Sequence, residues 1–290
     1  MSHIWRLLLL LPLLLVVPAL AQEDAPYFVT YDHHLEEPGN LELEMNSTTG
    51  VPRSGQRAYF APFAEIQYGV NRWWTSELYL EGQSTAGDSA VFTGWRLESR
   101  FRPFAAEHAI NPVFYVEYEN INEASRIQKE IAGKAPLAFQ PNSELSQAHA
   151  HELEAKLILS SDLRHWNIAE NLVVERNLSE NEGFEFGYAF AASRRLTQKV
   201  SPRPCRFCRE TMVAGLEFYG GLGSTQSFGL QQTAHYAAPV LAWALNDHST
   251  ISLSPAIGLT RYSNPVLLRV GYSYEIRGFR NKLLRLFRSH

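Results

Sequence analysis

The chain has 290 residues, a formal net charge of -4 and 45% hydrophobic residues. This length allows one large domain or two small ones. The nearly neutral charge excludes the strongly basic surface on which most nucleic-acid-binding proteins depend, so no nucleic-acid partner is expected. Aromatic residues are plentiful, with 13 Tyr, 16 Phe and 6 Trp, and such residues favour strands and the aromatic girdles of membrane barrels.

The first 21 residues have the features of a secretory signal peptide. Arg6 precedes an apolar run over 7–17, and Ala19 and Ala21 form an A-x-A cleavage signal. The alternative is an anchoring helix, but the run is short compared with the roughly 20 residues that cross a bilayer. We therefore expect cleavage after Ala21 and no membrane-spanning helix in the remainder of the chain.

A polar lead-in, 22–38, comes next, and we expect it to lie in the periplasm. From residue 39 to residue 277, apolar and polar residues then alternate in about twelve stretches of roughly 10–13 residues, the pattern of half-buried strands. In chain order these stretches cover 39–50, 57–69, 73–85, 91–102, 110–121, 148–160, 165–176, 183–193, 211–224, 234–245, 249–260 and 265–277.

The stretch 91–102, VFTGWRLESRFR, shows the alternation clearly. Successive side chains of a strand point to opposite faces, so Trp95 and Leu97 share one face while Arg96 and Glu98 share the other. A soluble β-sandwich could bury the apolar face in its core. However, the strands of ordinary globular proteins average about 5–6 residues, shorter than the stretches predicted here. Tilted membrane strands need roughly 9–11 residues. We therefore predict an all-β fold, an antiparallel up-and-down transmembrane β-barrel of about 12 strands.

Several strings, among them YFAPFAEIQYG (59–69), WWTSELYLEGQST (73–85), FTGWRLESRFRP (92–103) and NPVFYVEYE (111–119), resemble those of a group of bacterial outer-membrane β-barrel proteins. WNIAENLVVERNL (166–178) and GLEFYGGLG (215–223) extend the resemblance over most of the chain. The resemblance implies a location in the bacterial outer membrane. More distantly, the pattern is similar to the barrels of the phenol meta-cleavage pathway, which implies passage of small apolar solutes.

Charged residues on the polar faces of the strands are predicted to line the lumen, because Arg or Lys at the lipid midplane would cost roughly 2–4 kcal/mol. One interpretation is a pore lining that selects solutes by charge. The other, which the narrow barrel favours, is a charge network that fills the lumen. The predicted lining residues are Glu65, Glu77, Glu81, Arg96, Glu98, Arg100, Glu117, Glu119, Glu152, Glu154, Lys156, Glu217 and Arg269.

Cysteine and histidine pairs are the remaining candidates for chemistry. Cys205 and Cys208 form a C-x-x-C motif, which predicts a local disulfide in an oxidising compartment. The histidine pairs 33–34 and 149–151 are visible, but a metal site needs three or four converging ligands. The sequence therefore predicts neither a metal site nor a cofactor.

The expected function is non-enzymatic: a channel or uptake protein for small solutes, apolar ones included, or a structural envelope protein. Its expected partners are outer-membrane lipid and, during insertion, the barrel-assembly machinery. The alternative is a lipid-active hydrolase using Ser224 and His235, although no G-x-S-x-G motif supports it. The basic amphipathic tail, 278–290, is expected either to lie on the anionic inner leaflet or to fray.

Overall fold

The computed structural model describes residues 26–53, 55–127, 131, 138–180, 183–197 and 208–288. The expected signal peptide lies outside these residues. The strands are β1 (Leu41–Val51), β2 (Tyr59–Asn71), β3 (Trp74–Thr85), β4 (Ala90–Phe101), β5 (Asn111–Asn122), β6 (His149–Leu163), β7 (Trp166–Asn177), β8 (Glu185–Arg195), β9 (Met212–Ser224), β10 (Ser227–Phe228), β11 (His235–Asn246), β12 (Ser249–Gly258) and β13 (Val266–Ile276). The helices are α1 (Asn142–Leu145), the 3-10 turn η2 (Arg209–Thr211) and α2 (Phe279–Arg288).

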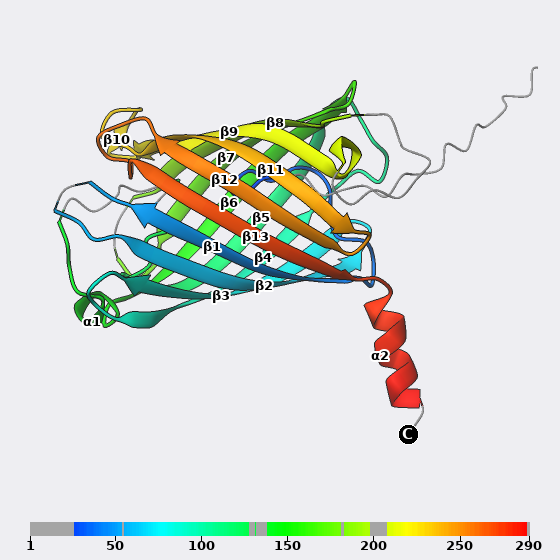
Figure 1. Cartoon of the computed structure of the whole chain (residues 1–290), viewed down its shortest axis with the longest axis horizontal. Helices are drawn as coiled ribbons and strands as arrows, with labels where there is room; N and C mark the ends of the chain where they lie inside the picture. Colours follow the sequence, from blue (N-terminus) through cyan, green and yellow to red (C-terminus); the bar gives the residue numbers. More distant parts are fainter. Residues whose placement is uncertain are drawn as a thin grey trace, which may run out of the picture.

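Twelve of the strands close into an antiparallel barrel (Figure 1). Each of these strands pairs with its neighbours along the chain, and β1 pairs with β13 to complete the ring. The two-residue strand β10, which the sequence pattern did not indicate, only extends the hairpin after β9. The predicted all-β, up-and-down barrel is therefore confirmed, and its strands run from Leu41 to Ile276.

The outer surface of the barrel is apolar. Leu80 of β3, Leu97 of β4 and Phe114 of β5 are 44%, 49% and 53% exposed, and each lies on the face opposite the buried charges of its strand. A broad apolar surface of this kind is costly in water but suits lipid, and a closed barrel leaves no unpaired edge within the membrane. No helix in the described part of the chain is long and apolar enough to span a bilayer.

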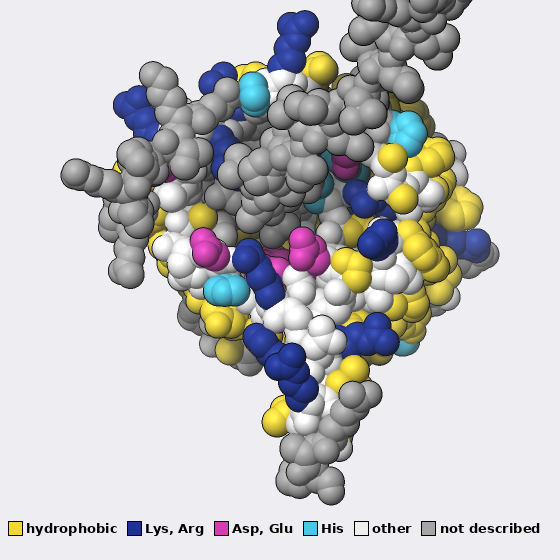
Figure 2. Space-filling view, turned by 90° about the vertical axis from the view of Figure 1, so that its right-hand side faces the viewer, with side chains coloured by type: hydrophobic (Ala, Val, Ile, Leu, Met, Phe, Trp, Pro, Cys, Tyr) yellow, Lys and Arg dark blue, Asp and Glu magenta, His cyan; other side chains and the backbone are white. Residues whose placement is uncertain are grey.

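The two ends of the barrel differ in their connections. At the end from which α2 projects (Figure 1), β2–β3, β6–β7 and β11–β12 are joined by turns of two residues. The opposite end carries the longest connection, 123–148, which contains α1. The view onto the first end shows basic side chains gathered around the root of α2 (Figure 2). Short turns on one side and longer loops on the other are typical of outer-membrane barrels.

The lead-in does not lie outside the barrel, as the sequence analysis expected for 22–38. Its described part, 26–38, folds into the lumen, where Val29, Thr30 and His33 are buried. The segment then crosses β2 so closely that a Cβ on Gly69 would stand 2.1 Å from the carbonyl oxygen of Glu37. The expectation was wrong because the polar residues of this segment find their hydrogen-bond partners on the lumen wall rather than in water.

Candidate functional site

Residues 28–30 of the lead-in are held by one buried carboxylate. The backbone N–H groups of Phe28, Val29 and Thr30 donate to Glu217 of β9, at 3.2, 3.0 and 2.9 Å. Hydrogen bonds to an ionised acceptor are stronger than neutral ones. Glu217 was predicted to line the lumen, and the structure places it inside the barrel as the anchor of the lead-in.

The next residue of the lead-in is held through both of its backbone polar groups. The N–H of Tyr31 donates to Asn171 Oδ1 at 2.7 Å, and Asn171 Nδ2 donates to the carbonyl oxygen of Tyr31 at 2.8 Å. The Tyr31 hydroxyl donates to Glu98 at 3.0 Å. The ammonium group of Lys156 lies 4.6 Å from the Tyr31 ring centroid, an arrangement that favours the cation. Tyr31 therefore connects the lead-in to three strands of the wall.

The lead-in leaves the lumen through a cluster of ionisable side chains. Asp32 Oδ2 lies 2.6 Å from His34 Nδ1, and His34 Nε2 lies 3.1 Å from Asp162. Burial alone would lower the pKa of His34, but these carboxylates outweigh it and raise the pKa to about 10. Burial would likewise raise the pKa of Asp32, but His34 holds it below its usual value. Burial lowers the pKa of the neighbouring His33.

Ion pairs connect the charged side chains of the wall. Arg96 contacts Glu81 at 2.6 Å and Glu117 at 3.0 Å. Arg100 contacts Glu77 and, at 3.2 Å, Glu98, and Lys156 contacts Glu154 at 2.8 Å. The Arg96 pairs and Arg100–Glu77 cross between neighbouring strands, whereas Arg100–Glu98 and Lys156–Glu154 lie within β4 and β6. Part of the predicted charge network therefore exists as the filling interpretation describes it.

The acidic residues nevertheless outnumber the basic ones. In the strand register, Glu77 lies opposite Glu98, Glu98 opposite Glu117, and Glu117 opposite Glu154. The row continues through Glu175, which lies opposite Glu154. Like charges that face each other directly across strands repel. The row therefore concentrates negative charge across five neighbouring strands, β3 to β7.

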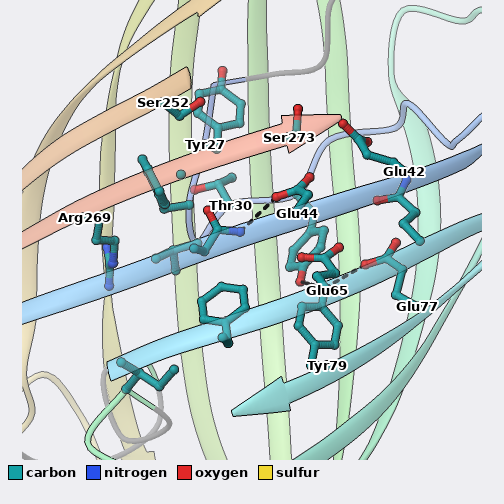
Figure 3. Close-up of a pocket in the computed structure, with 18 of the residues that line it drawn as sticks. Tyr27, Thr30, Glu42, Glu44, Glu65, Glu77, Tyr79, Ser252, Arg269 and Ser273 are labelled. Carbon is teal, nitrogen blue, oxygen red and sulfur yellow. Dashed lines mark hydrogen bonds between the residues drawn. The ribbon is translucent and has the colours of Figure 1, made fainter. Parts of the chain in front are cut away.

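A cavity of about 260 Å³ remains between the lead-in and the wall. Ten acidic side chains line it, against four Lys or Arg side chains. Figure 3 shows the carboxylates of Glu42, Glu44, Glu65 and Glu77 directed into this space, with Tyr27 and Thr30 of the lead-in across from them. The charged groups that line the cavity are therefore mostly acidic, which suits water and cations.

Ten of the thirteen predicted lining residues lie on this cavity, and Glu98, Glu152 and Glu217 are buried inside the barrel beside it. Sequence reasoning missed Glu175, Asn171 and Tyr31. The alternation of β7 places Asn171 and Glu175 on one face, so both could have been found by their positions. Nothing in the sequence indicated that Tyr31 lies in the lumen.

The long connection between β5 and β6 also enters the barrel. Ile127 and Ile131 pack against the buried cluster that contains Val29 of the lead-in and Tyr219 of β9. A Cβ on Gly187 would stand 2.6 Å from Cγ2 of Ile131, so the glycine makes room for this residue. The lumen is thus occupied from both ends, by the lead-in and by this loop.

The Ser224 and His235 pair of the hydrolase alternative does not form. His235 lies opposite Gly220 in the β9–β11 register, four residues from Ser224 or about 13 Å along the strand. Its ring nitrogens contact the Tyr188 hydroxyl at 3.1 Å and the Thr233 hydroxyl at 2.9 Å. Ser224 Oγ instead accepts a hydrogen bond from the N–H of Gln226. This pair cannot carry catalysis in this geometry.

Cys208 is disulfide-bonded, and its predicted partner Cys205 lies outside the described residues. Two groups of described side chains have the composition of a metal site: His33, His34 and Glu107, and the buried group Glu117, Glu119 and Glu154. In the second group, Arg96 and Lys156 already neutralise Glu117 and Glu154.

No protein-family model matches the chain, and no curated protein matches it by sequence. Among solved structures, the chain is similar to a KdgM porin in complex with disordered oligogalacturonate, at 6% identity and a TM-score of 0.48, over 81% of this chain and 98% of that one. It is also similar to the NanC porin, at 10% identity and a TM-score of 0.48, over 81% of this chain and all of that one. A third is the translocator domain of the autotransporter NalP from Neisseria meningitidis, at 11% identity and a TM-score of 0.41, over 82% of this chain and 89% of that one. The predicted relation to the phenol meta-cleavage barrels finds no support among these structures.

Proposed function

We propose that the protein is an outer-membrane channel for small cations or cationic solutes, held closed in this conformation by its own lead-in, 26–38. The observation that carries the proposal is the acidic cavity beside a segment that only non-covalent contacts hold. Ten acidic against four basic side chains on the cavity wall favour cations over anions and over apolar solutes.

Two side chains of the wall hold the backbone of the lead-in, in addition to the contacts made by its own side chains. Glu217 accepts three hydrogen bonds from the lead-in, and Asn171 exchanges two with Tyr31. Each contributes about 0.5–3 kcal/mol net, depending on whether a charge takes part. These five bonds together contribute about 5–12 kcal/mol, so a solute or a change of membrane conditions opens the lumen only if it stabilises the open state by a comparable amount.

Planar-bilayer recording of the refolded protein and its Glu217→Ala variant tests the proposal. The variant loses one carboxylate and with it three charge-assisted hydrogen bonds, which weakens the closed state by about 5–9 kcal/mol and raises the ratio of open to closed channels by roughly 1,000-fold or more. We expect rare conducting steps in the wild type, frequent steps in the variant, and reversal potentials that show cation selectivity. Glu144→Ala, on α1 at the far end, is the matched control.

Insertion of both proteins without conducting steps would refute the channel and would leave a structural envelope role. Frequent steps with anion selectivity would refute the role of the acidic wall. The location in the outer membrane is tested separately, by fractionation of cells that express the chain. The apolar outer face leads us to expect the protein with the membranes until detergent is added.

A further inference from the structure

The mouth of the barrel on the side from which α2 projects contains a second arrangement of polar side chains, which adjoins the acidic cavity through His34. His33 and His34 belong to the lead-in, Glu107 to the connection between β4 and β5, and Asp162 to the end of β6. Three separate parts of the chain thus meet at one point. The histidine pair is visible in the sequence, but no sequence pattern places Glu107 and Asp162 beside it.

The two imidazole rings are held in the same way. His33 Nδ1 lies 2.5 Å from Ser160 Oγ, and His34 Nδ1 lies 2.6 Å from Asp32 Oδ2. Histidine ligands of metals are oriented by such contacts, with one ring nitrogen bound to a carboxylate or another polar group. Both Nδ1 atoms are occupied, so both Nε2 atoms are left to face the remaining carboxylates.

The Nε2 atoms are as close to the neighbouring carboxylates as two ligands of one metal ion are to each other. His33 Nε2 is 2.9 Å from Glu107 Oε2, and ligand atoms of His33, His34 and Glu107 lie within 4.8 Å of one another. His34 Nε2 is 3.1 Å from Asp162 Oδ2, a carboxylate that lies beside this group. Neighbouring ligands of a tetrahedral zinc ion stand about 3.3 Å apart, each off the other's axis.

We propose that His33, His34 and Glu107 form a binding site for a divalent transition metal, Zn²⁺ fitting best. Two imidazole ligands and one carboxylate ligand, with water as the fourth, suit Zn²⁺, whereas Ca²⁺ and Mg²⁺ prefer sites made of oxygen alone. Binding places the metal between the Nε2 atoms and displaces any proton they carry, so protons are released. The metal then ties the lead-in to the β4–β5 connection.

Zinc titration of the refolded full chain in detergent tests this site, with calorimetry to measure affinity and bound Co²⁺ to report the ligands by its visible spectrum. We expect one metal ion per chain and tetrahedral Co²⁺ absorption. Glu107→Gln should weaken binding at least tenfold, as should His33→Asn. The Glu107 side chain is 58% exposed, so its substitution leaves the fold intact even where that of the buried His33 does not.

Two matched variants separate this site from other acidic groups. Glu119→Gln removes a member of the acidic group inside the barrel, and Glu144→Gln removes an exposed glutamate of α1. Neither should change the zinc affinity. The proposal is overturned if no saturable binding is found, if Glu107→Gln binds as tightly as the wild type, or if Glu119→Gln abolishes binding. Because the readout is binding, the result does not depend on whether the barrel conducts.

Discussion

Asn171→Ala is the substitution that most directly probes how the lumen is closed. The side chain of Asn171 is fully buried and exchanges two hydrogen bonds with the backbone of Tyr31. Alanine removes both and leaves an N–H and a carbonyl of the lead-in without these partners. At about 0.5–1.5 kcal/mol for each bond, the closed state loses about 1–3 kcal/mol, equivalent to a five- to 150-fold increase in the ratio of open to closed channels.

Single-channel recording measures this ratio directly, and Asn246→Ala at the β11–β12 turn is the matched control. The substitution should shorten the closed intervals and leave the conductance of each open step unchanged, because Asn171 acts on the lead-in rather than on the open path. Combined with Glu217→Ala, it should raise the open ratio further, since both side chains hold the same segment. Closed intervals equal to those of the wild type would refute the assignment of the lead-in as the element that closes the lumen.

Three further outcomes follow from particular contacts. Gly69→Ala should destabilise the barrel by about 1–3 kcal/mol in urea unfolding, because the added Cβ would stand 2.1 Å from a backbone oxygen. Gly82→Ala is the control and should not destabilise it, because its Cβ would stand 3.4 Å from the nearest atom. Equal unfolding midpoints of the two variants would contradict the close approach of the lead-in to β2. Neutralising Glu44 and Glu65 to Gln in the Glu217→Ala background should move the reversal potential toward zero, and an unchanged potential would remove these carboxylates from the ion path. Phe287→Trp on the exposed face of α2 should show blue-shifted emission with anionic vesicles and not with neutral ones if the tail lies on the lipid surface.

The alternation of the strands was enough to predict the barrel and the direction of its charged side chains. Glu77, Arg100 and Lys156 could be assigned to the inside because a strand has a period of two and lipid excludes charge. Strand ends were less certain: the structure extends β6 to Leu163, past the predicted residue 160, because the strand continues in register with β7 up to Trp166.

The lead-in could not be placed in the same way. Tyr31 and its partner Asn171 are separated by 140 residues, and Val29 and Glu217 by 188 residues. No periodicity connects positions so far apart. A polar segment before the first strand also has the composition of a segment that lies outside the barrel, in water. The same holds for His33 and Glu107, which only the closed barrel brings together.

The composition of the wall bears on what the lumen is for. A barrel that had only to be filled would be at least as stable with apolar side chains, because burying ion pairs gains little over hydrophobic packing. Here the row from Glu77 to Glu175 instead sets carboxylates directly opposite one another, an arrangement that costs stability. Arg96, Arg100 and Lys156 offset part of this repulsion. Once the lead-in withdraws, water and cations can occupy the space beside the acidic row. The carboxylates that repel one another in the closed barrel then attract cations into the open one.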